Sequence, residues 1–199
     1  MRLAFYTIAK NIVWGILKPL YRIKIIGSEN IPKEGSVLIC SNHISVLDPP
    51  VVGITSTRPI HFMAKEELFR VPILKTAISN LNAFPVKRGM SDRSAIRNAL
   101  AILNDDNVLG IFPEGTRNKE GNLGKGLAGV GFFALRSNAL VVPCAIIGPY
   151  KPFRKLHVVY GRPVDITEMR KQKASASEVT DVIMDAIGEI LENYDVKAS

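Results

Sequence analysis

Residues 41–50 read Ser-Asn-His-Ile-Ser-Val-Leu-Asp-Pro-Pro, and the rest of the chain is organised around this stretch. The apolar run at residues 37–40 before it is typical of a buried strand. The two prolines and the apolar residues after them indicate a helix start, with Asp48 expected at the N-cap and Pro49 at the first helical position. His43 therefore lies where a strand ends, and Asp48 lies one short turn later.

This turn allows the side chains of His43 and Asp48 to meet. The carboxylate would accept a hydrogen bond from one ring nitrogen, which fixes the tautomer and leaves the other nitrogen free as a base. On one continuous helix a spacing of five residues would place the two side chains roughly 140° apart, so the pairing depends on the turn. The alternative interpretation is structural, with Asp48 as a helix cap and His43 as a packed side chain.

A second stretch, Phe-Pro-Glu-Gly-Thr-Arg at residues 112–117, favours catalysis. Together the two stretches resemble the glycerolipid acyltransferase family, the 1-acylglycerol-3-phosphate acyltransferases of the PlsC type. That family carries Asn-His, four residues and Asp, here residues 42–48, and the second stretch without a change. It also has an apolar strand ending in a basic residue and Gly, here residues 84–89, and later an apolar strand with an internal Pro, here residues 141–146. Order and spacing agree across residues 35–150.

The resemblance implies a reaction and its substrates. A fatty acyl group would pass from the thioester of acyl-CoA or acyl carrier protein to the 2-hydroxyl of 1-acylglycerol-3-phosphate, giving phosphatidate in phospholipid biosynthesis. No cofactor besides this thioester co-substrate is implied. His43 would be the general base, supported by Asp48, and a positioned His typically contributes 10²–10⁴-fold. A different lysophospholipid acceptor remains an alternative.

The candidate substrate-binding residues lie in or near the matched motifs: Arg88, Glu114, Gly115, Thr116, Arg117 and Lys125. By resemblance, Arg117 and Arg88 would bind the acceptor phosphate with Lys125 as a weaker third, since a guanidinium can donate two parallel hydrogen bonds. Glu114 would either orient Arg117 or contact the acceptor. Gly115 permits close approach of the backbone to a ligand. For each basic residue the alternative is an ordinary surface charge.

Two possible nucleophiles near His43 raise a rival mechanism. Cys40 lies three residues before His43, and a Cys–His pair can form an acyl-enzyme; Ser45 is a lesser candidate of the same kind. The apolar neighbours of Cys40 favour an inert thiol. Cys40 and Cys144 both lie in apolar runs and are predicted to be small buried residues rather than a disulfide. No clustered ligand set suggests a metal.

The composition limits the class of protein and its partners. The chain has 199 residues, 47% of them apolar, which fits one globular domain. Its formal net charge of +8 implies an anionic partner, and the few aromatic residues and lack of nucleic-acid-binding motifs favour phospholipid over nucleic acid. Two alternatives from other classes are a non-catalytic protein that binds anionic lipid and a thioesterase that acts through Cys40.

Residues 2–20 predict a helix that lies on a membrane surface. Most of its circumference is apolar, Lys10 and Lys18 share a narrow polar face, and Trp14 lies near that face. No segment approaches the ~20 apolar residues needed to span a bilayer. We therefore expect a membrane-surface helix at 1–21 and a catalytic domain at 22–199, attached peripherally or monotopically to the cytoplasmic face of the cell membrane. The alternative is a helix packed on the protein's own core.

Alternating strands and helices predict an α/β domain with a largely parallel sheet, and the resemblance implies a mixed sheet wrapped by helices. The expected strands are at residues 21–26, 37–40, 60–64, 83–87, 108–112, 140–147 and 156–160. Besides the helix near residue 48, the expected helices are at residues 2–20, 66–80, 91–103, 129–138 and 175–194. Ser91 is the expected cap of the third, and Ser175 with Glu178 forms an expected capping box at the start of the last.

Overall fold

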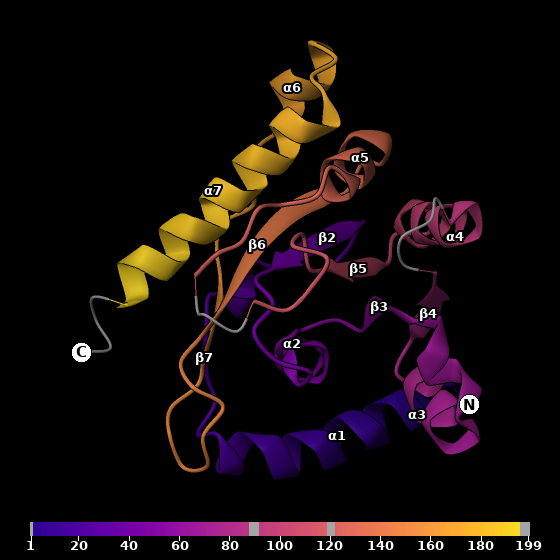
Figure 1. The fold of residues 1–199 in the computed structure, drawn as a ribbon, viewed down its shortest axis with the longest axis vertical. Coiled ribbons are helices and arrows are strands. Elements are labelled where there is room, and N and C mark those ends of the chain that lie inside the picture. The colour runs from indigo at the N-terminus through magenta and orange to yellow at the C-terminus, as the bar shows by residue number, and fades with distance from the viewer. Residues whose placement is uncertain (1, 88–91, 119–121, 196–199) are drawn as a thin grey trace.

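A seven-stranded sheet forms the centre of the molecule in the computed structural model, which describes residues 2–87, 92–118 and 122–195 (Figure 1). The strand order is β1-β7-β6-β2-β5-β3-β4; β6 and β7 pair antiparallel and the other neighbours pair parallel. The strands are β1 (Lys24–Ile26), β2 (Val37–Ser41), β3 (Ile60–Lys65), β4 (Ala83–Val86), β5 (Val108–Ile111), β6 (Leu140–Ile147) and β7 (His157–Tyr160). The expected α/β fold with a mixed sheet is confirmed.

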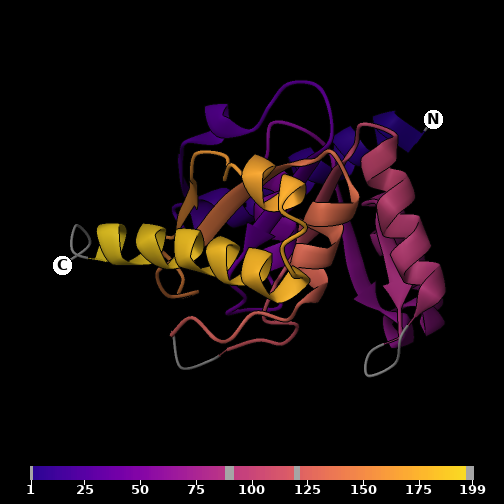
Figure 2. The ribbon, with the colours of Figure 1, turned by 90° about the horizontal axis from the view of Figure 1, so that it is seen from above.

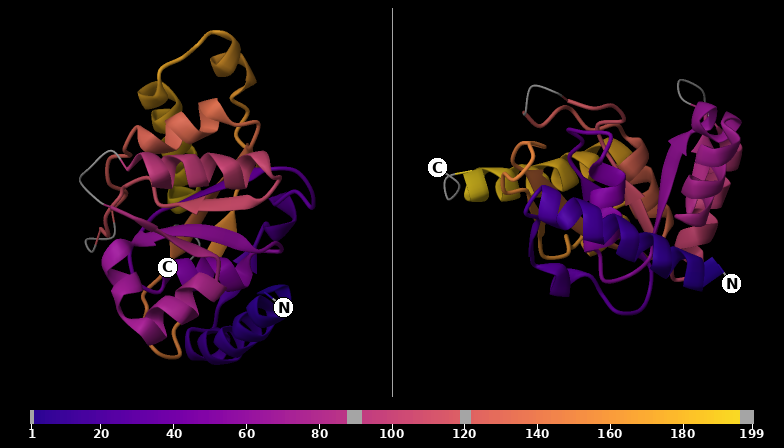
Figure 3. Two further views of the ribbon diagram at one scale, coloured as in Figure 1. Left: turned by 90° about the vertical axis from the view of Figure 1, so that its right-hand side faces the viewer. Right: turned by 90° about the horizontal axis from the view of Figure 1, so that it is seen from below.

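Helices cover both faces of the sheet. They are α1 (Arg2–Leu20), α2 (Asp48–Thr55), α3 (Pro72–Asn80), α4 (Arg93–Asn104), α5 (Gly129–Arg136), α6 (Thr167–Lys171) and α7 (Ala176–Asp195), with 3-10 turns η1 (Ser28–Asn30) and η2 (Glu66–Arg70). The left view of Figure 3 shows α1 below the sheet and α4 and α5 above it. In Figure 2, α7 lies alongside α5 on that upper side. Each face buries its own apolar cluster.

The position of β2 in the sheet explains why its sequence is continuously apolar. It lies between β5 and β6, and all of its residues are buried. Leu38 and Cys40 pack in the cluster beneath α4, α5 and α7, whereas Val37 and Ile39 pack in the cluster beneath α1 and α2. A parallel strand with both faces covered needs apolar residues at every position rather than at alternate ones.

Helix caps agree with the predictions in one case and differ in another. The Ser175–Glu178 capping box is confirmed: the Ser175 N–H donates to Oε2 of Glu178 at 2.7 Å, and the Glu178 N–H donates to Oγ of Ser175 at 3.2 Å. For α4 the cap is Asp92, whose Oδ1 accepts two backbone N–H groups of the first turn. Ser91, the expected cap, lies outside the described residues.

The single helix expected over residues 66–80 is wrong. The chain instead forms η2, an extended residue at Val71, and then α3, which begins at Pro72. A proline disfavours helical geometry at the residue before it and tolerates the first turn of a new helix. The sequence also failed to indicate α6, whose five residues are too few for a periodic pattern.

The inner face of α1 packs on the domain. Tyr6 and Leu17 are buried, and Val13 and Trp14 contact the same cluster as α2. The Lys10 ammonium donates to the Ser56 carbonyl at 2.7 Å, just beyond the C-terminal end of α2, where carbonyls lack helical partners. Lys10 and Trp14 were expected on a solvent- or lipid-facing polar face; both turn toward the protein because these contacts are available there.

The outer face of α1 is an apolar stripe, defined by Phe5, Ile8, Ile12 and Ile16 at helical spacing. Ile8, Ile12 and Ile16 are each 58–59% exposed, a large fraction for isoleucine. The helix therefore packs one face on the core, as in the alternative arrangement, and exposes another face that is apolar. Within the part of the chain that the structure describes, no helix is both long and apolar enough to cross a bilayer.

Candidate active site

The His43–Asp48 pair that the sequence predicts is present in the structure. His43 Nδ1 lies 2.7 Å from Oδ2 of Asp48, and both residues are buried. The same oxygen accepts the backbone N–H groups of Ile44 at 2.6 Å and Ser45 at 2.7 Å. Because Oδ2 already accepts two backbone N–H groups, the carboxylate acts as an acceptor here. We therefore assign the proton of the imidazole to Nδ1, facing Asp48, which leaves Nε2 as the nitrogen available as a base.

This arrangement corrects the expected position of Asp48 in the helix. Asp48 is the first residue of α2 and Leu47 is the N-cap. The carboxylate folds back over the turn that precedes α2, where it binds the N–H groups of Ile44 and Ser45. It therefore stabilises the turn that carries His43 as well as the histidine itself.

Asn42 anchors the start of the same turn to the sheet. Its Oδ1 accepts the Ile146 N–H at 2.8 Å and its Nδ2 donates to the Ile146 carbonyl at 3.0 Å. The Asn42 side chain thus bonds β6 in the way that the backbone of a strand residue would, and it extends the pairing of β2 with β6 by one position. The sequence contained Asn42 within the Asn-His motif but gave no indication of this partner.

The second motif holds the backbone of His43 from two sides. The His43 N–H donates to Oε1 of Glu114 at 2.9 Å, and the Asn118 N–H donates to the His43 carbonyl at 2.8 Å. Oε2 of the buried Glu114 accepts the Gly124 N–H at 2.9 Å. Glu114 therefore joins the turn that carries His43 to the glycine-containing segment at residues 122–126, a role that neither of the two sequence alternatives contained. A Cβ at Gly124 would lie 2.6 Å from Oε2, so the contact requires glycine.

Phe112 and Gly115 complete the surroundings of the imidazole. The rings of His43 and Phe112 stack with centroids 4.2 Å apart and planes 22° apart, which fixes the ring from its face. Gly115 has φ +67°, a left-handed conformation that glycine adopts at no steric cost. It also lines the cavity at His43.

Two cavities adjoin the catalytic turn. One, of about 440 Å³, is lined by His43 together with Phe112, Lys87 and apolar residues of α5. The other, of about 330 Å³, lies under α1 and α2 and is almost wholly apolar, with Val46 and Pro49 of the turn in its wall. An apolar cavity with a few polar groups at its edge is typical of a site for a small organic ligand.

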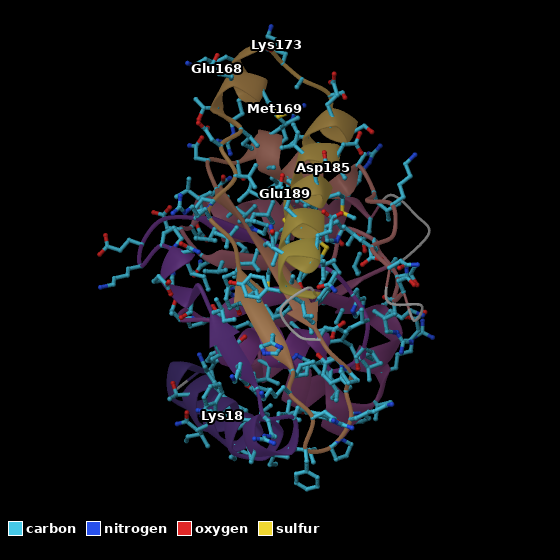
Figure 4. The ribbon with its side chains drawn as sticks, turned by 90° about the vertical axis from the view of Figure 1, so that its left-hand side faces the viewer. Lys18, Glu168, Met169, Lys173, Asp185 and Glu189 are labelled. Carbon is cyan, nitrogen blue, oxygen red and sulfur yellow. The ribbon has the colours of Figure 1, made fainter. Side chains whose placement is uncertain are left out.

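The predicted substrate-binding residues lie in different places relative to His43. Thr116 and Arg117 are exposed and directly precede Asn118, the residue bonded to the His43 carbonyl. Lys125 lies instead in a groove with acidic residues of α7, two of which, Asp185 and Glu189, are labelled in Figure 4. Arg88 lies outside the described residues. Its neighbour Lys87, which we did not single out as a ligand, lines the His43 cavity.

The rival nucleophiles have poor surroundings for reaction. Cys40 is fully buried on the face of the sheet covered by α4 and α5, and burial raises the pKa of its thiol far above its usual range. A thiol that stays protonated is a weak nucleophile. The Ser45 hydroxyl accepts the Leu47 N–H at 3.2 Å and so takes part in the turn. Both observations favour His43 as a base that acts directly on a substrate hydroxyl.

Comparison with known proteins identifies the family of the chain. The sequence profile of a family described as acyltransferase matches residues 22–147, which include both motifs. This chain belongs to the acyltransferase family. The family predicted from the four motifs is thereby confirmed, and the chain is identified as an enzyme.

Individual relatives agree with this assignment. The 1-acyl-sn-glycerol-3-phosphate acyltransferase of Borreliella burgdorferi is 28% identical over 186 residues, covering 88% of this chain and 74% of that protein. The protein of the same name from Bacillus subtilis is 31% identical over 146 residues, 72% of each chain. The solved 1-acyl-sn-glycerophosphate acyltransferase PlsC of Thermotoga maritima has a TM-score of 0.73 at 23% identity, covering 96% of this chain and 79% of that one; this likeness shows the shared fold.

Proposed function

We propose that this acyltransferase moves a fatty acyl group from acyl-CoA or acyl carrier protein to the 2-hydroxyl of 1-acylglycerol-3-phosphate. The observation that carries the proposal is the buried His43–Asp48 pair at a cavity. Hydrogen bonds join the His43 backbone to Glu114 at 2.9 Å and to Asn118 at 2.8 Å, on either side of Arg117 in the chain. The names of the two relatives described above support the acceptor. The thioester is a co-substrate, and the reaction as proposed needs no metal or other cofactor.

The proposed step is a direct transfer without a covalent enzyme intermediate. Nε2 of His43 takes the proton of the 2-hydroxyl while the hydroxyl oxygen attacks the carbonyl carbon of the thioester. When the tetrahedral intermediate collapses, the carbon–sulfur bond breaks and the thiolate leaves. It takes up the proton from the imidazolium, so His43 returns to its neutral form. Asp48 stabilises the imidazolium through the bond at Nδ1.

Arg117 supplies the recognition of the acceptor phosphate in this proposal. Its exposed guanidinium lies one residue before Asn118, which is fixed to His43. A bidentate bond to phosphate would place the acceptor relative to the base. Arg88 is proposed to assist, whereas the acidic surroundings of Lys125 make it the weakest of the three candidates.

We further propose that the apolar stripe of α1 attaches the enzyme peripherally to the cytoplasmic face of the membrane. Its substrates carry long hydrocarbon chains, and a bilayer surface supplies them at high local concentration. The stripe offers four large exposed side chains on the face opposite the core contacts. Partial burial of such side chains, together with basic residues near the headgroups, is sufficient for reversible attachment without a span.

Turnover of defined substrates tests the reaction. Purified protein is incubated with an acyl thioester and 1-acylglycerol-3-phosphate, and both free thiol and phosphatidate are measured. Equal amounts of the two products are expected, and the His43→Ala variant should form neither. The His157→Gln variant, changed at a histidine of β7, is the matched control and should keep its activity. Thiol release without phosphatidate would support the thioesterase, and no release would support a non-catalytic lipid-binding protein.

A further inference from the structure

A loop between β6 and β7, residues 148–156, lies against the C-terminal end of α1. The Phe153 N–H donates to the Leu20 carbonyl at 2.6 Å and the Leu156 N–H donates to the Tyr21 carbonyl at 3.0 Å. In Figure 1, α1 and this loop together form the lower edge of the molecule. Hydrogen bonds therefore fix the loop to the helix that presents the apolar stripe.

Phe153 stands at the tip of this loop in an unusual conformation. The Arg154 N–H donates to the Lys151 carbonyl at 3.1 Å, so residues 151–154 form a β-turn with Pro152 in its second position. Phe153 occupies the third position with φ +62° and is 72% exposed. Proline followed by a residue with positive φ is the pattern of a type II turn, whose third position favours glycine. An aromatic residue there costs free energy and gains nothing from the protein's own core.

The charged residues of the loop that carries Phe153 are all of one sign. Lys151, Arg154 and Lys155 flank it and are exposed, and the loop contains no acidic residue. The adjoining N-terminal segment is also free of carboxylates, since the first acidic residue of the chain is Glu29. The acidic residues of α7 that Figure 4 labels lie far from Lys18 at the lower end of the molecule. The lower edge is thus apolar and basic.

We propose that residues 148–156 form a second bilayer contact, in which Phe153 enters an anionic phospholipid surface beside the apolar stripe of α1. The turn aims the ring away from the protein, and the basic side chains lie where phosphate headgroups would surround it. Two contacts joined by hydrogen bonds fix how the enzyme is oriented on the membrane, which a single helix lying in the surface does not. The proposal rests on the membrane attachment proposed above.

Fluorescence tests whether position 153 enters the bilayer. The chain has one tryptophan, so the Trp14→Phe/Phe153→Trp double variant carries its only indole at the loop tip. With vesicles of phosphatidylcholine and phosphatidylglycerol, we expect a blue shift of emission and quenching by brominated lipids. The matched control is Trp14→Phe/Leu140→Trp, at the opposite end of β6 and 48% exposed, which should show neither change. Unchanged emission at position 153 while the protein still pellets with the vesicles would overturn the proposal.

Partition measurements add a test that separates binding from folding. Phe153→Gly removes the ring and relieves the positive φ, so it should weaken partition on the order of tenfold while thermal stability stays the same or rises. Replacing Lys151, Arg154 and Lys155 by Gln should weaken binding to anionic vesicles roughly fivefold per residue and leave binding to neutral vesicles unchanged. Normal partition of both variants would overturn the proposal. Because no substrate is present, this outcome would leave the proposed acyl transfer intact.

The same loop carries a second residue with a separate consequence. The Tyr150 hydroxyl donates to Oδ1 of Asp48 at 2.7 Å, on the oxygen that does not face His43. Tyr21 packs edge-on against the Tyr150 ring, with centroids 5.3 Å apart and planes 82° apart. Burial and the nearby charge of Asp48 raise the pKa of the Tyr150 hydroxyl, so it stays protonated and donates its proton to the carboxylate. No pattern in the sequence indicated this residue.

The geometry points to Tyr150 as a positioning residue that fixes the plane of the Asp48 carboxylate. Tyr150→Phe should lower kcat on the order of tenfold, the range for a hydrogen bond to a charged group. Without this hydrogen bond the Asp48 carboxylate is more basic, so it stabilises the His43 imidazolium more strongly. The acidic limb of the pH–rate profile should therefore move to higher pH. Tyr21→Phe, which removes the neighbouring hydroxyl, should leave that limb in place. A loss of activity in Tyr150→Phe with an unmoved limb would show a packing role instead.

Discussion

The Asp48→Asn substitution tests the proposed mechanism most sharply, because it removes the negative charge of Asp48 while an asparagine of the same shape can keep its hydrogen bonds. The carboxylate accepts four hydrogen bonds, from His43, Ile44 and Ser45 at Oδ2 and from Tyr150 at Oδ1. An asparagine whose oxygen takes the place of Oδ2 still accepts three of them. Its Nδ2 then donates to the Tyr150 hydroxyl, which can also accept. We therefore expect the variant to fold, with a melting temperature within about 5 °C of the parent.

The expected loss of activity follows from the missing charge. Two unit charges about 4 Å apart interact by about 4 kcal/mol at an effective dielectric constant of 20. The imidazolium exists only while His43 holds the substrate proton, so this interaction is stronger in the transition state than in the ground state. At 1.36 kcal/mol per factor of ten, kcat should fall about 10³-fold, with the acceptor KM little changed.

The assay compares steady-state phosphatidate formation and thermal unfolding for Asp48→Asn and Asp48→Ala. Alanine leaves the partly buried N–H groups of Ile44 and Ser45 without their acceptor, at up to about 1–3 kcal/mol each, so that variant should lose stability as well as activity. A folded Asp48→Asn enzyme within tenfold of the parent kcat would refute the role assigned to the charge. Equal destabilisation of both variants would refute the argument from hydrogen-bond shape.

Three further outcomes are expected. Cys40→Ala should keep most of the activity, because its thiol is buried in the core; an inactive variant, with acyl group trapped on Cys40 in the parent, would favour the acyl-enzyme. Arg117→Lys should raise acceptor KM and lower turnover with thioester binding little changed, and an equal loss with a lysolipid that lacks phosphate would show a structural role. Replacing Ile8, Ile12 and Ile16 by Ser should release the protein from anionic vesicles without lowering its melting temperature, since all three are exposed; a protein that still pellets would refute attachment by α1.

The sequence predicted the elements whose cause is local. The His43–Asp48 pair follows from a spacing of five residues across a turn, and the Ser175–Glu178 capping box from a spacing of three. The strand at β2 follows from a continuous apolar run, which a doubly covered parallel strand requires. In the two side-chain pairs the partners lie within five residues of each other along the chain, so the pattern contains the whole interaction. The partner strands of β2 are far away in the chain, but its burial on both faces is visible in its own composition.

The sequence did not predict which face of α1 packs on the core, because a long-range contact decides it. A helical wheel of residues 2–20 placed Lys10 on a narrow polar face, which was expected to be the outer one since an ammonium normally lies in solvent. The structure offers it the carbonyl of Ser56 at the end of α2, a partner 46 residues away. This contact turns Tyr6 and Leu17 into the core and leaves Ile8, Ile12 and Ile16 outside. Replacement of Leu17 would therefore disturb folding, although the helical wheel grouped it with the outer residues.

The contacts that fix the catalytic turn are long-range, but the sheet makes them consistent with one another. Glu114 is 71 residues from His43, Ile146 is 104 from Asn42, and Tyr150 is 102 from Asp48. Because β2 lies between β5 and β6, both parallel to it, the segments that follow all three strands meet at the same edge. The strand order, rather than any single motif, therefore brings the base, its supports and the loop of Arg117 together. A sequence reading that fixed this order could have placed Glu114 and Asn42, whereas Tyr150 also requires the path of the loop after β6.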